Sequence, residues 1–98
     1  MNYPDEFKKL AFDVLTADIL GIRSLEGIRD HILKGLKPQQ RQRLELYLME
    51  TLDGHMSDKE INALWDKTGT DVMFHRPAAA RNFLLKVQDW LAESDKPL

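Results

Sequence analysis

The sequence predicts an all-α fold, a single-domain antiparallel bundle of about five helices. Apolar residues recur at steps of three and four along most of the chain, whereas the alternation that is typical of strands is nearly absent. Helix start and stop residues divide the chain into five segments with short connections, which favour antiparallel neighbours. A chain of 98 residues can fill one hydrophobic core but not two, so we expect residues 1–98 to form one domain.

The first helix is expected from Pro4 to Leu20, because proline is favoured in a first helical turn and Gly21 follows. Its inward stripe consists of Phe7, Leu10, Ala11, Val14 and Leu15. Ser24 is the expected N-cap of the second helix, and Gly35 is its expected end. The buried positions predicted for this helix are Leu25, Ile28, Ile32 and Leu36.

Pro38 begins the third predicted helix, which runs to Gly54. Its apolar face contains Leu44, Tyr47, Leu48, Thr51 and Leu52. The fourth helix has the clearest start, because Ser57 followed by Glu60 makes a capping box. The residues expected to face inward from it are Ile61, Leu64 and Trp65, and Gly69 should end it.

The segment from Thr70 to His75 is expected to be extended, with Val72 and Phe74 reaching the core. The last helix is expected from about Pro77 to Glu93. Its buried stripe is Ala80, Phe83, Leu84, Val87 and Leu91. Trp90 should lie half exposed at the border of this stripe, and residues 95–98 should fray.

The composition excludes several classes of function. Without cysteine the chain has no disulfides, no thiolate chemistry and no sulfur-ligated metal. No apolar run approaches the roughly 20 residues of a membrane-spanning helix. The chain starts with acidic rather than basic residues, and no hydrophobic segment follows, so we expect no secretory signal. These features favour a cytoplasmic protein.

The three histidines, His31, His55 and His75, fall on three different segments. Metal binding or general-base catalysis would need two of them brought together with a carboxylate. Asp53 and His55 flank Gly54, but two ligands are too few, and exposed polar residues at helix ends are the simpler interpretation. Neither a phosphate-binding glycine loop nor a nucleophile elbow occurs. We therefore predict that the chain is not an enzyme and holds no metal or cofactor.

The middle of the chain is strongly acidic, although the formal net charge is only -2. Residues 45–71 hold two lysines and seven carboxylates, which are Glu45, Glu50, Asp53, Asp58, Glu60, Asp66 and Asp71. If the third and fourth helices are antiparallel neighbours, several of these carboxylates share one end of the bundle. Such a surface can steer a cationic protein to the site. The candidate binding site is therefore this acidic group, and an ordinary solvated acidic surface is the alternative.

Two other functions stay open. A helical nucleic-acid-binding regulator would use the basic residues Lys34, Lys37, Arg41 and Arg43. The fourth and fifth helices superficially resemble a helix-turn-helix, but the fifth begins Arg76-Pro-Ala-Ala-Ala, which leaves few groups to read bases. A homodimeric adaptor would use leftover apolar surface at Leu36, Tyr47 or Trp90.

From about residue 44 to residue 91 the order of signals resembles that of small helical immunity proteins of bacterial contact-dependent growth inhibition systems. The matching features are Leu52-Asp53-Gly54, Ser57 with Glu60, Leu64-Trp65, the turn Thr68-Gly69-Thr70-Asp71, Phe74, Phe83-Leu84 and Trp90-Leu91. Two positions depart from the family's pattern: a single Trp65 replaces a tryptophan pair, and Gly69-Thr70 replaces a proline-alanine pair.

The resemblance implies a cytoplasmic antidote that binds the C-terminal toxin domain delivered by a neighbouring cell. Such a toxin is very often a nuclease, with a ribonuclease favoured, and a toxin of another activity such as a pore former stays possible. Trp65, Asp71, Phe74, Phe83 and Leu84 occupy the family's motif positions, and the resemblance implies that they determine the fold. Binding residues vary with the toxin, so the acidic group rests on charge alone. We expect a monomer that binds neither nucleic acid nor membranes directly.

Overall fold

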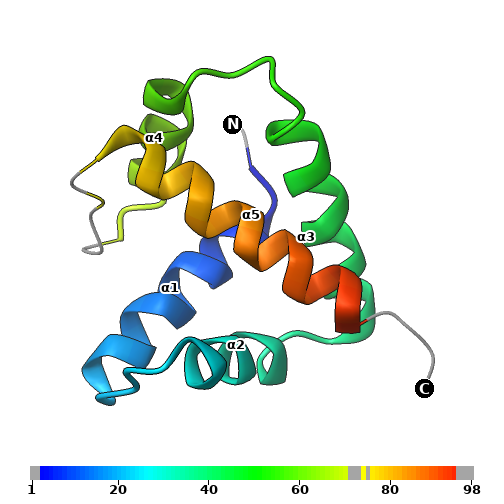
Figure 1. Cartoon of the computed structure of the whole chain (residues 1–98). Coiled ribbons are helices and arrows are strands. Elements are labelled where there is room, and N and C mark those ends of the chain that lie inside the picture. The colour runs from blue at the N-terminus through cyan, green and yellow to red at the C-terminus, as the bar shows by residue number, and fades with distance from the viewer. Residues whose placement is uncertain (1–2, 71–73, 75, 95–98) are drawn as a thin grey trace.

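Five α-helices make up the part of the chain that the computed structural model describes, namely residues 3–70, 74 and 76–94 (Figure 1). They are α1 (Asp5–Ile19), α2 (Leu25–Lys34), α3 (Pro38–Thr51), α4 (Asp58–Asp66) and α5 (Pro77–Ser94). Those residues contain no strand, so the predicted all-α helical bundle is confirmed. The predictions for Asp71, Val72, His75 and residues 95–98 lie outside the described residues.

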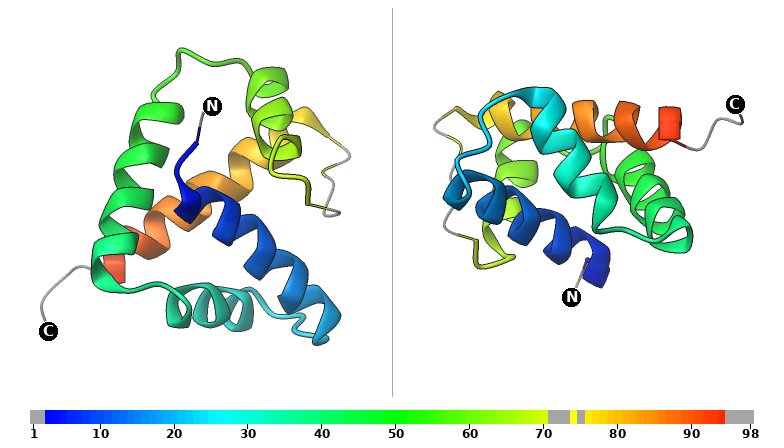
Figure 2. Two further views of the ribbon diagram at one scale, coloured as in Figure 1. Left: turned by 180° about the vertical axis from the view of Figure 1, so that it is seen from behind. Right: turned by 90° about the horizontal axis from the view of Figure 1, so that it is seen from below.

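Helix α5 is the element that joins the others. It packs against α4, α3 and α2, whereas α1 packs against α2 and α3. Figures 1 and 2 show α5 running across the molecule from α4 toward α2 and α3. Helices α3 and α4 run in opposite directions but stand apart, and the segment that leads into α1 lies between them (Figures 1 and 2). The two helices are therefore antiparallel, but each packs on α5 rather than along the other.

The helix boundaries follow the capping residues identified in the sequence. The Ser24 hydroxyl accepts a hydrogen bond from the backbone N–H of Gly27, and Ser57 and Glu60 form the predicted capping box. Helix α3 ends at Thr51 rather than at Gly54, because Leu52 already leaves the helical conformation with φ -100° and ψ 15°. Gly69, just after α4, has a φ of +77°, a conformation that favours glycine over any other residue.

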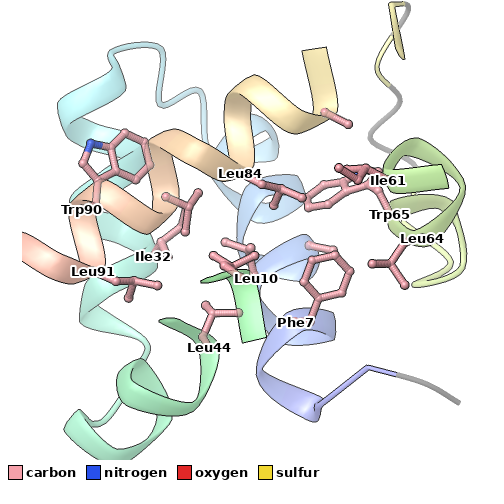
Figure 3. Packing of buried hydrophobic residues seen from close by; sticks show 14 of the residues in the cluster. Phe7, Leu10, Ile32, Leu44, Ile61, Leu64, Trp65, Leu84, Trp90 and Leu91 are labelled. Atoms are coloured by element: carbon pink, nitrogen blue, oxygen red, sulfur yellow. The ribbon is translucent and has the colours of Figure 1, made fainter. Parts of the chain in front are cut away.

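Trp65 is the largest of the fully buried side chains in the core (Figure 3). Its ring makes edge contacts with Phe7, Phe74 and Phe83 at centroid distances of 6.0, 5.3 and 6.0 Å. Figure 3 shows Trp65 at one side of a single cluster to which all five helices contribute, among them Leu10, Ile32, Leu44 and Leu84. The predicted inward positions of α4 are thus confirmed, and Phe74 reaches the core as expected.

Two apolar residues lie elsewhere than predicted. Trp90 is 8% exposed rather than half exposed, and its ring lies 6.3 Å from that of Phe83. Seven residues make about two helical turns, so Trp90 falls on the same side of α5 as Phe83. Leu25 is 52% exposed rather than buried, because it is the first residue of α2 and sits beside the exposed turn that follows Leu20.

Two buried carboxylates form ion pairs, one between α1 and α3 and the other within α1. Glu6 Oε2 lies 3.3 Å from Arg43 Nε, and Asp13 Oδ2 lies 3.2 Å from Lys9 Nζ. Gly35 lies next to the second pair and has an ordinary φ of -83°. A Cβ atom there would lie 3.0 Å from Lys9 Nζ and 3.1 Å from Asp13 Oδ2.

Within the described residues, no helix is both long and apolar enough to cross a bilayer.

Candidate partner-binding surface

Four of the predicted acidic residues gather where α3 gives way to α4. Glu50 lies in the last turn of α3, Asp53 lies in the connection, and Asp58 and Glu60 lie in the first turn of α4. This is the upper end of the molecule in Figure 1. The acidic cluster therefore forms around the connection between α3 and α4, even though the two helices do not pack along each other.

A shallow groove lies at the same place. Its volume is about 310 Å³, and it is lined by Tyr47, Glu50, Thr51, His55, Met56 and Leu64. Tyr47, Met56 and Leu64 give it an apolar surface, and Glu50 and His55 add charge and polarity. The Tyr47 ring rests on Phe7 at a centroid distance of 5.3 Å, so one wall of the groove is anchored in the core. Burial raises the pKa of the Tyr47 hydroxyl.

Asp53 and His55 form a local pair on the connection. The backbone N–H of His55 donates a hydrogen bond to Asp53 Oδ1 over 3.0 Å, and the Nδ1 atom of its ring contacts the same oxygen. The bond to the His55 side chain, followed by the bond to its backbone, lowers the pKa of Asp53. The carboxylate of Asp53 therefore stays ionised, and it holds the imidazole at the groove.

Asp58 and Glu60 have roles within the fold. Asp58 Oδ1 accepts a hydrogen bond from Arg81 Nε over 2.5 Å, and Arg81 Nη2 also donates to the backbone carbonyl of Met56. Glu60 Oε1 accepts a hydrogen bond from the backbone N–H of Ser57 over 2.9 Å. That bond is the main cause of the lowered pKa of Glu60. At least one oxygen of each carboxylate thus accepts a hydrogen bond that stabilises the start of α4.

Glu50 differs from its neighbours. Its side chain is exposed, and no described residue forms an ion pair with it. It also lies near the C-terminus of α3, which is the negative end of the helix dipole. A carboxylate there lowers the stability of the helix by roughly 0.3–1 kcal/mol. Folding alone does not favour a glutamate here, so Glu50 is the carboxylate best placed to meet an outside cation.

Two of the other predicted acidic residues, Glu45 and Asp66, do not join this surface. Glu45 precedes Glu50 by five residues, which places the two side chains about 140° apart around α3. Asp66 is the last residue of α4, at the opposite end of that helix from Asp58. Asp71 lies outside the described residues. Charge counting along the sequence located the cluster but could not separate the faces of a helix.

The basic residues are also partly committed to the fold. Arg41 donates hydrogen bonds to the backbone carbonyls of Leu33 and Leu36, over 2.6 and 3.1 Å, and so covers the C-terminal end of α2. Arg43 pairs with Glu6. Of the predicted cluster, Lys34 at the end of α2 and Lys37 just before α3 remain as exposed cations.

The exposed apolar surface was not foreseen. Leu36 and Trp90 are buried, and Tyr47 is partly buried. Instead Phe12 and Ile19 are 60% and 72% exposed on α1, and Leu20 follows them. A second hollow, of about 200 Å³, lies beside Phe12 and is lined by Lys8, Ala11, Phe12, Leu15 and residues 68–70. Helix α1 carries apolar residues on two sides, and the inner stripe alone was recognised in the sequence.

The histidines stay apart in the described part of the chain. His31 Nε2 lies 2.8 Å from Thr16 Oγ1 and links α2 to α1, and His55 is held by Asp53. His75 lies outside the described residues. Among the described residues, no three histidine, aspartate or glutamate side chains come together as a metal site would require.

Comparisons with protein-family models, with curated proteins and with solved structures find no significant match. The function has to be inferred from the groove and the charges around it.

Proposed function

We propose that this chain is an immunity protein of a contact-dependent growth inhibition system. In this proposal it acts in the cytoplasm as a monomer, without a cofactor and without catalysis. It binds the C-terminal toxin domain of the effector and blocks it. The favoured toxin is a nuclease, in particular a ribonuclease, because such an enzyme carries positive charge with which it holds a polyanion.

The observation that supports this function is the acidic groove between α3 and α4. Three carboxylates at positions 50, 53 and 60 are exposed around it, and an exposed carboxylate rim attracts a basic protein and aligns it. The apolar lining adds the contact area that a charged surface alone lacks. We assign Glu50 and Asp53 to direct toxin contact, and Asp58 and Glu60 chiefly to holding the surface in shape.

The test uses the C-terminal domain of the protein that the gene immediately upstream encodes, which the proposal takes to be the toxin. Co-expression of this chain should restore growth of bacteria that express that domain, and the purified pair should form a complex with equal numbers of each chain. Glu50→Lys should weaken the complex by roughly tenfold, mainly through slower association at low salt. The measurements are growth and surface plasmon resonance at two salt concentrations.

Glu93→Lys is the matched control, because Glu93 is also an exposed carboxylate in the last turn of a helix, here α5. It changes the net charge equally and should leave binding within about twofold of the parent. Failure to protect against the upstream toxin would overturn the function. Equal protection and equal affinity for the parent and Glu50→Lys would place the docking site elsewhere.

A homodimeric adaptor is the second candidate function, and the exposed apolar residues Phe12, Ile19 and Leu20 support it. Burying such a patch against a second copy would release water from both surfaces. A mass that rises with concentration in analytical ultracentrifugation, and that returns to the monomer value in Phe12→Ser, would favour it. A constant monomer mass up to about 100 μM would exclude it.

A further inference from the structure

We propose that the groove between α3 and α4 receives a single long cationic side chain, a lysine or an arginine, from the partner protein. The inference rests on the proposed function only in taking the partner to be the toxin domain. The groove is defined by Tyr47, Glu50, Thr51, His55, Met56 and Leu64. Its volume of about 310 Å³ suits one side chain rather than a folded element.

The lining fits the aliphatic part of such a side chain. Met56 and Leu64 supply apolar surface from the connection and from α4, and the half-buried Tyr47 supplies an aromatic ring from α3. Lysine and arginine bury their methylene stems along such surfaces while their charged heads stay in contact with water or with an anion. An arginine head can also stack on a tyrosine ring.

The charge at the rim selects a cation. Glu50 has an ionisable carboxylate without an ion-pair partner among the described residues, and it lies at the negative end of the α3 dipole. Asp53 follows three residues later and is ionised. Only Glu50 of these two lines the groove, so a cation bound there meets its carboxylate at the negative end of the α3 dipole. An anionic or neutral side chain would meet the same groups at a disadvantage.

The cationic groups near the groove do not cancel this preference. His55 lines the groove, but the Nδ1 atom of its ring contacts Oδ1 of Asp53, so a carboxylate already lies against the imidazole. Arg81 is the nearest fixed cation on α5, and its guanidinium is bound to Asp58 and to the carbonyl of Met56. Glu50 consequently remains available to a cation from outside the chain.

The test is an NMR titration with two short peptides, acetyl-Gly-Arg-Gly-amide and the same peptide with citrulline in place of arginine. Citrulline has nearly the same shape without the charge. The arginine peptide should shift the signals of Tyr47, Thr51, Met56 and Leu64 in a saturable way. Its dissociation constant, expected in the millimolar range, should be about fivefold lower than that of the citrulline peptide.

Glu50→Gln should remove the preference for arginine, whereas Glu93→Gln should keep it. Equal binding of the two peptides, shifts that arise elsewhere on the molecule, or an unchanged preference in Glu50→Gln would each overturn the inference. Because the toxin is absent from this titration, its result does not depend on protection. A groove that binds arginine in a chain that fails to protect would leave the inference standing and overturn the proposed function instead.

Discussion

Arg81 on α5 and Asp58 at the start of α4 are joined by a hydrogen-bonded ion pair, with Arg81 Nε 2.5 Å from Asp58 Oδ1. The same guanidinium donates to the carbonyl of Met56 in the preceding connection. The Arg81 side chain thus holds both the start of α4 and the connection before it against α5. The groove owes its shape to a residue that does not line it.

Arg81→Met should lower the free energy of unfolding by about 1–2 kcal/mol, because it removes two charge-assisted hydrogen bonds from a partly buried site. Lys86→Met is the matched control, since Lys86 is an exposed cation on the same helix. It should change stability by less than about 0.5 kcal/mol. Urea unfolding followed by circular dichroism measures both. Equal stability of the two variants would show that the ion pair contributes nothing measurable.

The stability of the chain should fall in acid partly through Asp53 and Glu60. Hydrogen bonds lower the pKa of both groups in the folded state. A lowered folded-state pKa adds stability that is present at neutral pH and is lost as the pH falls through the carboxyl range, below about 4. Asp53→Asn and Glu60→Gln should therefore be less stable than the parent at pH 7. That difference should shrink at pH 3 in urea titrations, and a difference independent of pH would contradict the assignment.

Trp90→Ala should destabilise the fold by about 3–4 kcal/mol, because it removes a buried indole that packs on Phe83. Leu85→Ala offers the comparison, since Leu85 is 40% exposed on the same helix and should cost less than about 1 kcal/mol. In Trp65→Phe, the remaining fluorescence of Trp90 should also be weakly quenched by acrylamide. Strong quenching would instead show that Trp90 is half exposed, as the sequence predicted.

Arg41→Ala should destabilise the fold by about 1–2 kcal/mol, because it uncovers two carbonyl groups at the end of α2. Lys37→Ala should stay within about 0.5 kcal/mol of the parent. A test of nucleic-acid binding should consequently reverse Lys34 and Lys37 alone, and gel-shift titrations with RNA and DNA can then be read without loss of the fold. Equal losses of stability in Arg41→Ala and Lys37→Ala would contradict the capping role of Arg41.

The helices could be predicted because their signals are local. Ser24, Ser57 and Glu60 act within one turn of their own helix, and the period of the apolar residues identifies the inward side of α4 and α5. The position of Trp90 was missed because a residue at the edge of a stripe is buried or exposed according to what packs beside it, and here Phe83 does so.

The candidate site was predicted less completely, because it depends on contacts between segments distant in sequence. Counting charges located the acidic stretch, but the pairing of Asp58 with Arg81 spans 23 residues, and that of Glu6 with Arg43 spans 37. Whether a charge is available to a partner is decided by such pairs. The groove itself could not be seen in the sequence, because it arises from the separation of α3 and α4.

The path of the first residues has a practical consequence. The hydroxyl of Tyr3 donates a hydrogen bond to the carbonyl of Lys67, just after α4, and this holds the start of the chain in the space between α3 and α4. A purification tag or fluorescent fusion joined directly to Tyr3 would therefore start from the space between the two helices that form the groove. Fusions for interaction assays should therefore follow α5. A tag on the N-terminal side of Tyr3 would compete with any molecule that docks in the groove.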